Sequence, residues 1–188
     1  MKFNAAHGPS SPGLLQDGPA VSVAGDVGGG ILFDARPAGN STTDTDEDDD
    51  GILDQEGTTA ITSFSSAAAV RIGSATRDIA IGAVASSTAG HGLVARGTIS
   101  GAGVYTGVDA NAIAIGGLGH AVDLAAGITL AGTVQAQAVA ANATALRFGS
   151  GTSAPAIVVT GVVSAQGGGP PPAAPERSSS TPAPPSPA

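Results

Sequence analysis

The chain of 188 residues contains no cysteine and no tryptophan, and it has only one tyrosine and four phenylalanines. Without cysteine, neither a disulfide framework nor a thiolate metal site can form. With so few aromatic side chains, the interior has to be built from Val, Ile, Leu and Ala, which is unusual for an ordinary single-core globule. A narrow interior between opposed sheets is filled well by such small branched residues. The composition therefore favours a stack of repeats.

Basic residues and long apolar runs are also scarce. Seven Lys and Arg stand against fifteen Asp and Glu, and this balance, with so few aromatics, excludes a nucleic-acid-binding surface. No apolar stretch of about 20 residues runs without interruption, so no transmembrane segment is expected. The N-terminus lacks the apolar run of a signal peptide, and we therefore expect a fragment or an incorrectly placed start.

The sequence does contain a short alternating stretch, broken by one glycine, that occurs four times. The copies are residues 21–27, 93–99, 128–134 and 157–163. In the last three, Gly97, Gly132 and Gly161 are 35 and 29 residues apart, a spacing typical of solenoids. One copy is a strand and a turn, too small to bury an apolar face alone, so the copies must stack. These three glycines are predicted to occupy equivalent points of successive repeats.

The apolar residue that opens each of these copies should also recur in space. We predict that Leu93, Ile128 and Ile157 form one interior column of an all-β solenoid. A second motif precedes three of the copies, in the form Val70-Arg-Ile-Gly73, Ile113-Ala-Ile-Gly116 and Leu146-Arg-Phe-Gly149. Its alternation is that of short, half-buried strands.

The chain divides into three parts by composition. Residues 1–19 are predicted to be a poorly ordered segment, residues 20–166 a β-solenoid domain, and residues 167–188 a Pro-, Ala- and Ser-rich linker or tail. Within the domain, the run 30–33 is interpreted as part of a hairpin. The stretch 133–146 is rich in Ala and Gln and would score as helix in isolation. We assign it to strand and turn because it bridges two repeat copies.

An acidic loop at residues 44–57 holds eight of the fifteen acids and resembles a calcium loop. Counted from Asp46, carboxylates fall at positions one, three and five, and Gly51 at position six permits a sharp turn. Calcium requires six to eight oxygen ligands, which alternate acids on such a loop supply. The predicted ligands are Asp46, Asp48, Asp50, Ile52 through its carbonyl, Asp54 and Glu56.

The end of this loop departs from the EF-hand pattern. Position twelve, where a bidentate acid is expected, is Gly57, and Glu56 lies one residue early. The loop is more similar to the Asp-x-Asp-x-Asp-Gly-x-x-Asp repeats of thrombospondin type 3 and related bacterial calcium loops. The alternative interpretation is a solvated acidic linker that binds no specific metal.

No catalytic constellation is evident. His91 and His120 have similar contexts beside strand starts, so a paired metal or catalytic role stands as one interpretation, with solvent-facing turn histidines as the simpler one. No Gly-x-Ser-x-Gly elbow is present, and the remaining acids and bases are scattered singly. We expect no enzyme.

The Gly- and Ala-rich repeats resemble the passenger regions of autotransporter-type outer-membrane proteins of alphaproteobacteria. The resemblance covers residues 20–165 and is carried by the runs at 72–77, 90–94, 115–119 and 159–165. It implies a right-handed parallel β-helix displayed at the cell surface, with an acidic calcium-like loop near its start. The family pattern also includes an export signal and a C-terminal membrane β-barrel, and we recognise neither here, so the chain is expected to be a fragment.

Three functions follow as hypotheses. The first is a non-catalytic passenger segment that serves as a stalk or an adhesive surface at the cell surface or outer membrane. The second is a calcium-stabilised module that binds a surface glycan or a protein ligand. The third is a β-helix enzyme acting on polysaccharides, which would need two carboxylates within about 10 Å of each other in a groove.

Overall fold

The computed structural model describes residues 15–36 and 57–168. These residues form fifteen β-strands and no helix. The strands belong to four sheets, and every strand pairing in them is parallel. The all-β character expected from the alternating patterns is confirmed.

Each sheet collects strands from distant parts of the sequence. Sheet A comprises β1 (Val21–Val23), β4 (Ala68–Ile72), β8 (Ala110–Ile115) and β12 (Ala143–Phe148). Sheet B comprises β5 (Ile79–Ile81), β9 (Val122–Leu124) and β13 (Thr152–Ser153). Sheet C comprises β2 (Ile31–Phe33), β6 (Leu93–Ala95), β10 (Ile128–Leu130) and β14 (Ile157–Val159). Sheet D comprises β3 (Ala60–Ser63), β7 (Thr98–Gly103), β11 (Thr133–Ala138) and β15 (Val162–Gly167).

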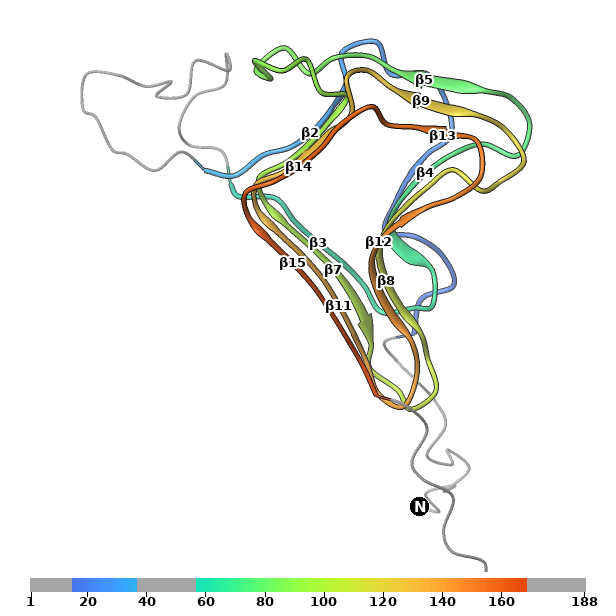
Figure 1. The fold of residues 1–188 in the computed structure, drawn as a ribbon. Helices are drawn as coiled ribbons and strands as arrows, with labels where there is room; N and C mark the ends of the chain where they lie inside the picture. Colours follow the sequence, from blue (N-terminus) through green and yellow to red (C-terminus); the bar gives the residue numbers. More distant parts are fainter. Residues whose placement is uncertain (1–14, 37–56, 169–188) are drawn as a thin grey trace, which may run out of the picture.

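The chain passes through the sheets in the fixed order A, B, C, D and then returns to A. We call one such passage a rung. The rungs are residues 21–63, 68–103, 110–138 and 143–167. In the first rung sheet B is represented by Val27 alone, which forms a parallel bridge to Ile81. Figure 1 looks along the stack, so the four passages lie nearly over one another.

The strand register confirms that Leu93, Ile128 and Ile157 align in one column, in which Leu93 and Ile128 are buried and Ile157 is exposed. Ile128 pairs with Leu93 on one side and with Ile157 on the other. The glycines next to these strands also follow one another from rung to rung: a Cβ on Gly132 would lie 2.0 Å from the carbonyl oxygen of Gly97. A Cβ on Gly161 would likewise lie 2.0 Å from the carbonyl oxygen of Gly132. Glycine is required at these corners because backbones of adjacent rungs are in direct contact.

The assignment of residues 21–27 as the first copy of this motif is wrong. Val21 pairs with Val70, so β1 belongs to sheet A and corresponds to the second motif. The true first-rung counterpart in sheet C is Ile31, which pairs with Leu93. The motif is not recognisable there because 26 residues separate β2 from β3, against two between β6 and β7. The position equivalent to Gly97 falls on Thr59, whose carbonyl accepts from the Thr98 N–H. The inserted segment splits the pattern.

Of the two local predictions, the hairpin at residues 30–33 is wrong and the strand and turn at residues 133–146 are confirmed. The run 30–33 does not form a hairpin, because its residues pair in parallel with β6, a strand of the next rung. The assignment of 133–146 to strand and turn is confirmed, because β11 and the first residues of β12 occupy it. Stacking between neighbouring rungs overrides the helical propensity of the Ala and Gln residues.

The buried apolar core consists only of Ile, Leu, Val and Ala among the described residues. Its large side chains come from sheets A, B and C and from the first inward positions of sheet D, and they are completely buried in the middle rungs. The cluster is continuous along the stack. This confirms the core composition that the lack of aromatic residues predicts.

The lower part of each rung is narrower, and there sheets A and D converge toward a point (Figure 1). A Cβ on Gly101 of β7 would lie 2.3 Å from the carbonyl oxygen of Asn111 on β8. A Cβ on Gly103 would lie 2.1 Å from that of Val108. In the next rung Ala136 and Ala138 take the same register positions. The two sheets approach so closely that Gly and Ala fill these positions in the middle rungs and the small Ser63 fills the first, which explains much of the unusual composition.

Candidate functional site

The predicted calcium ligands lie outside the described residues. This holds for all six, namely Asp46, Asp48, Asp50, Ile52, Asp54 and Glu56. Within residues 15–36 and 57–168, no group of three or more His, Asp or Glu side chains comes close enough to hold a metal ion. The calcium loop therefore stays a prediction from the sequence.

His91 is the one buried histidine of the described ranges, with 4% of its surface exposed. It precedes β6, and the segment before it lies beside the outward residues Val94, Thr129 and Val158 of sheet C. Within that segment the Val84 N–H donates to the His91 carbonyl at 3.0 Å. The ring Nδ1 is hydrogen-bonded to the Thr129 hydroxyl of the next rung. The His91 backbone N–H donates to the Ser87 hydroxyl at 3.0 Å. His91 thus fastens this covering segment to two rungs.

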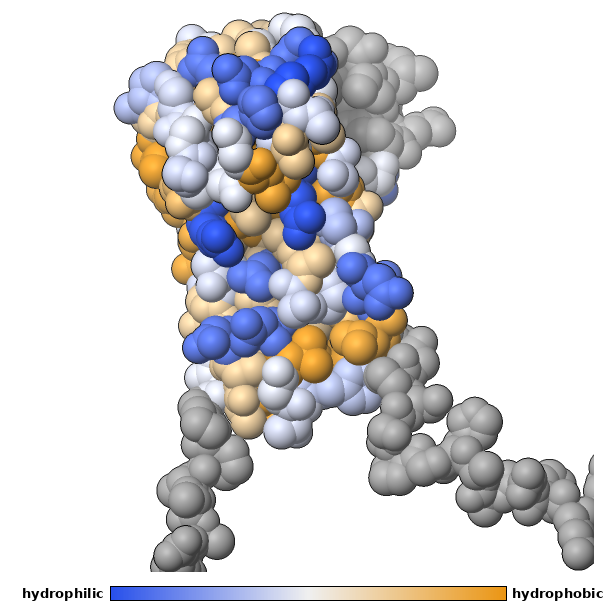
Figure 2. Space-filling view, turned by 90° about the vertical axis from the view of Figure 1, so that its right-hand side faces the viewer, coloured by the Kyte–Doolittle hydropathy of each residue, from blue (hydrophilic) through white to orange (hydrophobic). Residues whose placement is uncertain are grey.

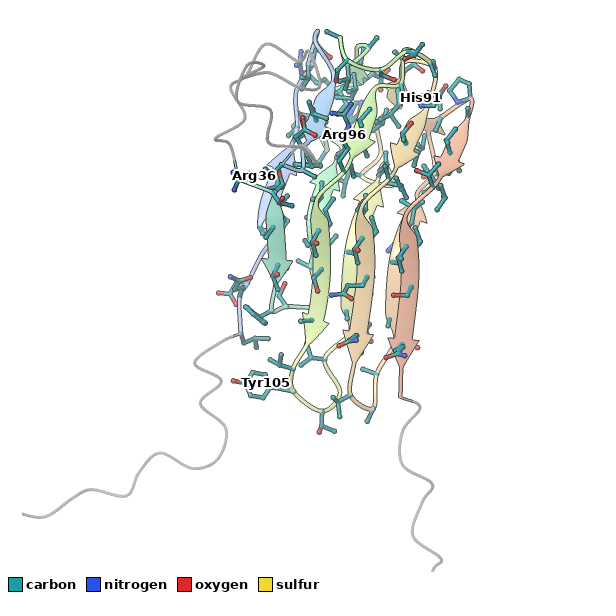
Figure 3. The ribbon with its side chains drawn as sticks, turned by 90° about the vertical axis from the view of Figure 1, so that its left-hand side faces the viewer. Arg36, His91, Arg96 and Tyr105 are labelled. Carbon is teal, nitrogen blue, oxygen red and sulfur yellow. The ribbon has the colours of Figure 1, made fainter. Side chains whose placement is uncertain are left out.

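An open hollow of about 260 Å³ lies beside His91. It is lined by Ser and Thr hydroxyls, small apolar residues, the imidazole and one guanidinium, contributed by Ser86, Ser87, Thr88, Ala89, His91, Val94, Arg96, Thr129, Ala131 and Val158. The Ser86 hydroxyl is buried and makes no hydrogen bond within the protein. Figure 3 shows His91 and Arg96 on the same upper part of the molecule, above the long strands of sheet D.

The guanidinium in this hollow is part of an ion pair. Arg96 Nη1 lies 3.0 Å from Asp34 Oδ1 and 3.3 Å from Oδ2. The Asp34 side chain is only 14% exposed and also accepts the Ala35 N–H at 2.8 Å. Asp34 belongs to the first rung and Arg96 to the second. The ion pair therefore links the two rungs directly after β2, where the long segment between β2 and β3 begins.

The two histidines of similar sequence context do not come together. His91 precedes a strand of sheet C, whereas His120 precedes β9 of sheet B. His120 Nδ1 lies 3.2 Å from Asp78 Oδ1, at the surface. Their similar Gly-rich contexts reflect two different corners of the rung, and the paired role finds no support in their positions.

Three of the scattered aspartates share a function that the sequence interpretation missed. Each lies directly before the first residue of a strand or bridge, and each accepts a backbone N–H of the following rung. The pairs are Asp26 with Ala80 at 2.9 Å, Asp78 with Ala121 at 2.8 Å, and Asp109 with Asn142 at 2.9 Å. Asp26 also forms an ion pair with Arg77 at 3.3 Å. An Asp immediately before an alternating strand was the signal that could have identified these links between rungs.

A backbone N–H that donates to a carboxylate favours its ionised form. Asp78 illustrates it: the Ala121 N–H, and secondly His120, hold the pKa of its carboxyl below the ordinary value. The hollow at His91 is lined by no carboxylate, whereas glycoside hydrolysis uses two. The Ser87 hydroxyl accepts from the backbone N–H of His91, and the ring is hydrogen-bonded to Thr129, so no serine of the described ranges is hydrogen-bonded to this imidazole.

No family model, curated protein or solved structure matches this chain. Functional conclusions therefore rest on the residues themselves. No helix in the described residues is long and apolar enough to cross a membrane. On the face seen in Figure 2, hydrophilic and hydrophobic residues are interspersed and form no single large apolar patch.

The lowered pKa of Asp78 predicts a dependence of stability on pH. Because folding favours the carboxylate, its stabilisation is present above the ordinary aspartate pKa and is lost as the pH falls through the lowered value. Asp78→Asn should therefore melt below the wild type at neutral pH, and the two proteins should converge in strong acid. Asp123→Asn, which removes an exposed carboxylate from the adjacent strand β9, is the control and should melt with the wild type at neutral pH. A difference for Asp78→Asn that is as large in acid would contradict the prediction.

Proposed function

We propose that the chain is a right-handed parallel β-solenoid that serves as a non-catalytic scaffold, a segment of a bacterial autotransporter passenger displayed at the cell surface. The observation that carries the scaffold is the fixed order in which the chain visits four parallel sheets, one strand per sheet and rung. A stack of this kind extends by adding rungs and presents long, regular outer faces.

The polar residues support a structural role. Asp26, Asp78 and Asp109 each accept an N–H of the next rung, and Asp34 pairs with Arg96 of the next rung. These acids hold rungs together and do not converge on a groove. The proposal of a cell-surface location depends on the resemblance of the repeats and on no contact in the structure.

A second candidate is favoured by the outer face of sheet D. Its outward positions carry mostly uncharged hydroxyl and amide side chains in register across rungs. Ser100, Gln135 and Ser164 form one row, and Gln137 and Gln166 follow Ala102 in the next. Gln135 Nε2 reaches the Ser100 hydroxyl at 3.5 Å. A flat face of neutral hydrogen-bonding groups suits a glycan or another protein surface, and calcium at the acidic loop would stabilise such a module.

A glycan array distinguishes the two candidates. The labelled full chain is applied in millimolar calcium and again with a chelator, and calorimetry on the same samples measures calcium binding. The scaffold predicts no retention on the array in either buffer. Retention that requires calcium, and that is lost with the double variant Asp48→Asn and Asp50→Asn, would favour the binding module. If calorimetry shows no heat at millimolar calcium, the acidic loop is a solvated linker.

A further inference from the structure

The two ends of the stack differ in how well their apolar side chains are covered. In the last rung Ile157 is 51% exposed, Val159 49% and Val163 39%, although all three occupy columns whose members in the two middle rungs are buried. In the first rung, the corresponding apolar side chains are at least partly buried against the core. Among the described residues, only the fourth rung therefore presents the open cross-section of the core.

The first rung is closed in part by the chain that leads into it. The Gln16 N–H donates to the Phe64 carbonyl at 3.1 Å, and the Phe64 N–H donates to Gln16 Oε1 at 3.1 Å. The Ser65 hydroxyl contacts the Gly18 carbonyl oxygen at 3.4 Å. Within the described residues, no segment contacts the outer edge of β14 or β15 in this way.

The edge strands of the fourth rung also lack the usual protection against pairing. Natural edge strands carry charges, prolines or bulges that prevent association with another strand. β14 and β15 contain no charged residue and no proline, and no charged residue occurs anywhere in residues 148–168. β15 is a six-residue strand at the free edge of sheet D, visible as the outermost strand in Figure 3.

The following residues are poorly suited to cover this end. Residues 169–188 include eight prolines, which cannot donate hydrogen bonds to a strand ladder. Charge also discriminates among other arrangements. By sequence, residues 21–63 hold ten acids and one base, so two first rungs would repel each other, and a first rung against a fourth would remove charges from water. Two fourth rungs bring together only neutral surfaces.

From these observations we infer that the fourth rung is a docking surface for a second copy of the same chain, so that two stacks join end to end at their C-terminal rungs. A two-fold axis makes the interface self-complementary and closed. The two copies of β15 then run antiparallel, which is a favourable ladder geometry, and Ile157, Val159 and Val163 become buried in the interface. The product is a dimer with the two first rungs at its outer ends.

Sedimentation velocity on the full chain tests the inference. The wild type should sediment as a dimer whose dissociation on dilution is measurable, and Val159→Lys should sediment as a monomer. The matched control is Gln137→Lys, which adds the same charge on the outward face of the neighbouring strand β11 and should remain dimeric. Circular dichroism verifies that both variants retain strand structure.

Chemical cross-linking provides a second measurement in case Val159→Lys fails to fold. Because the chain has no cysteine, single-cysteine variants report one position each. Ser164→Cys in β15 should give a covalent dimer with a short bis-maleimide, whereas Ser22→Cys in β1 should not. A wild type that is monomeric at every concentration, a cross-link at Ser22→Cys, or growth of open filaments would overturn the inference. A monomeric full chain that dimerises after truncation at Gly168 would also overturn it, because the tail would then cover the surface.

Discussion

Gly132→Ala is expected to be among the most destabilising single substitutions in this protein. The added Cβ would lie 2.0 Å from the Gly97 carbonyl oxygen and 2.1 Å from that of Arg96, both of them backbone atoms of the preceding rung. Neither can move without shifting β6 or β7. We expect a loss of about 3–5 kcal/mol in the free energy of unfolding and a fall in melting temperature of roughly 10 °C.

Gly29→Ala is the matched control for this substitution. Gly29 lies in the turn before β2, and a Cβ there would meet no atom within 4 Å. Its melting temperature should stay within a few degrees of the wild type, because surface changes of this kind cost about 0.5 kcal/mol or less. Equal effects of the two substitutions would mean that the rungs are farther apart at the Gly97–Gly132–Gly161 corner than the structure places them.

The second large effect is expected for Ile128→Ala. Ile128 is completely buried between Leu93 and Ile157, so truncation leaves a cavity inside the stack and should cost about 2–5 kcal/mol. Ile157→Ala removes the same atoms from the same column at its open end. In dilute solution it should cost about 1 kcal/mol or less, because half of that side chain is already exposed. Thermal or denaturant unfolding of both variants measures the difference.

The concentration dependence of the Ile157→Ala effect tests what covers the open end of the column. If Ile157→Ala costs as much as Ile128→Ala even at high dilution, the end of the column is covered within a single chain. If the cost of Ile157→Ala rises with protein concentration, the cover is a second molecule, as the end-to-end dimer requires.

The sequence predicts those features that recur at a nearly constant interval. Adjacent rungs in this part of the chain differ little in length, so a residue type that recurs in the sequence recurs at the same position of each rung. This is why Leu93, Ile128 and Ile157 align. The first rung could not be aligned in this way, because the insertion after Phe33 separates two strands that are adjacent in every other rung. The alternating pattern of residues 21–27 resembles the strands of sheet C, although β1 belongs to sheet A.

The features that the sequence did not predict depend on contacts between rungs. Asp78 and Asp109 looked like isolated surface acids because their partners, Ala121 and Asn142, are backbone groups more than thirty residues away. Any residue type except proline offers such an N–H, so the partner leaves no mark in the sequence. The burial of His91 has the same origin, since it depends on a segment that folds back over sheet C.

The corner at which the insertion leaves the first rung is closed by hydrogen bonds. The Thr59 N–H donates to the Asp34 carbonyl at 2.8 Å, and the Arg36 N–H donates to the Thr58 hydroxyl at 3.0 Å. Because the stem is held by these bonds and by β2 and β3, the length between its ends has little influence on the stack: doubling a loop costs only about 0.6 kcal/mol in closure entropy. This corner is thus a natural graft point, at which a foreign peptide or a small domain can replace residues 37–56 without altering the register of any strand.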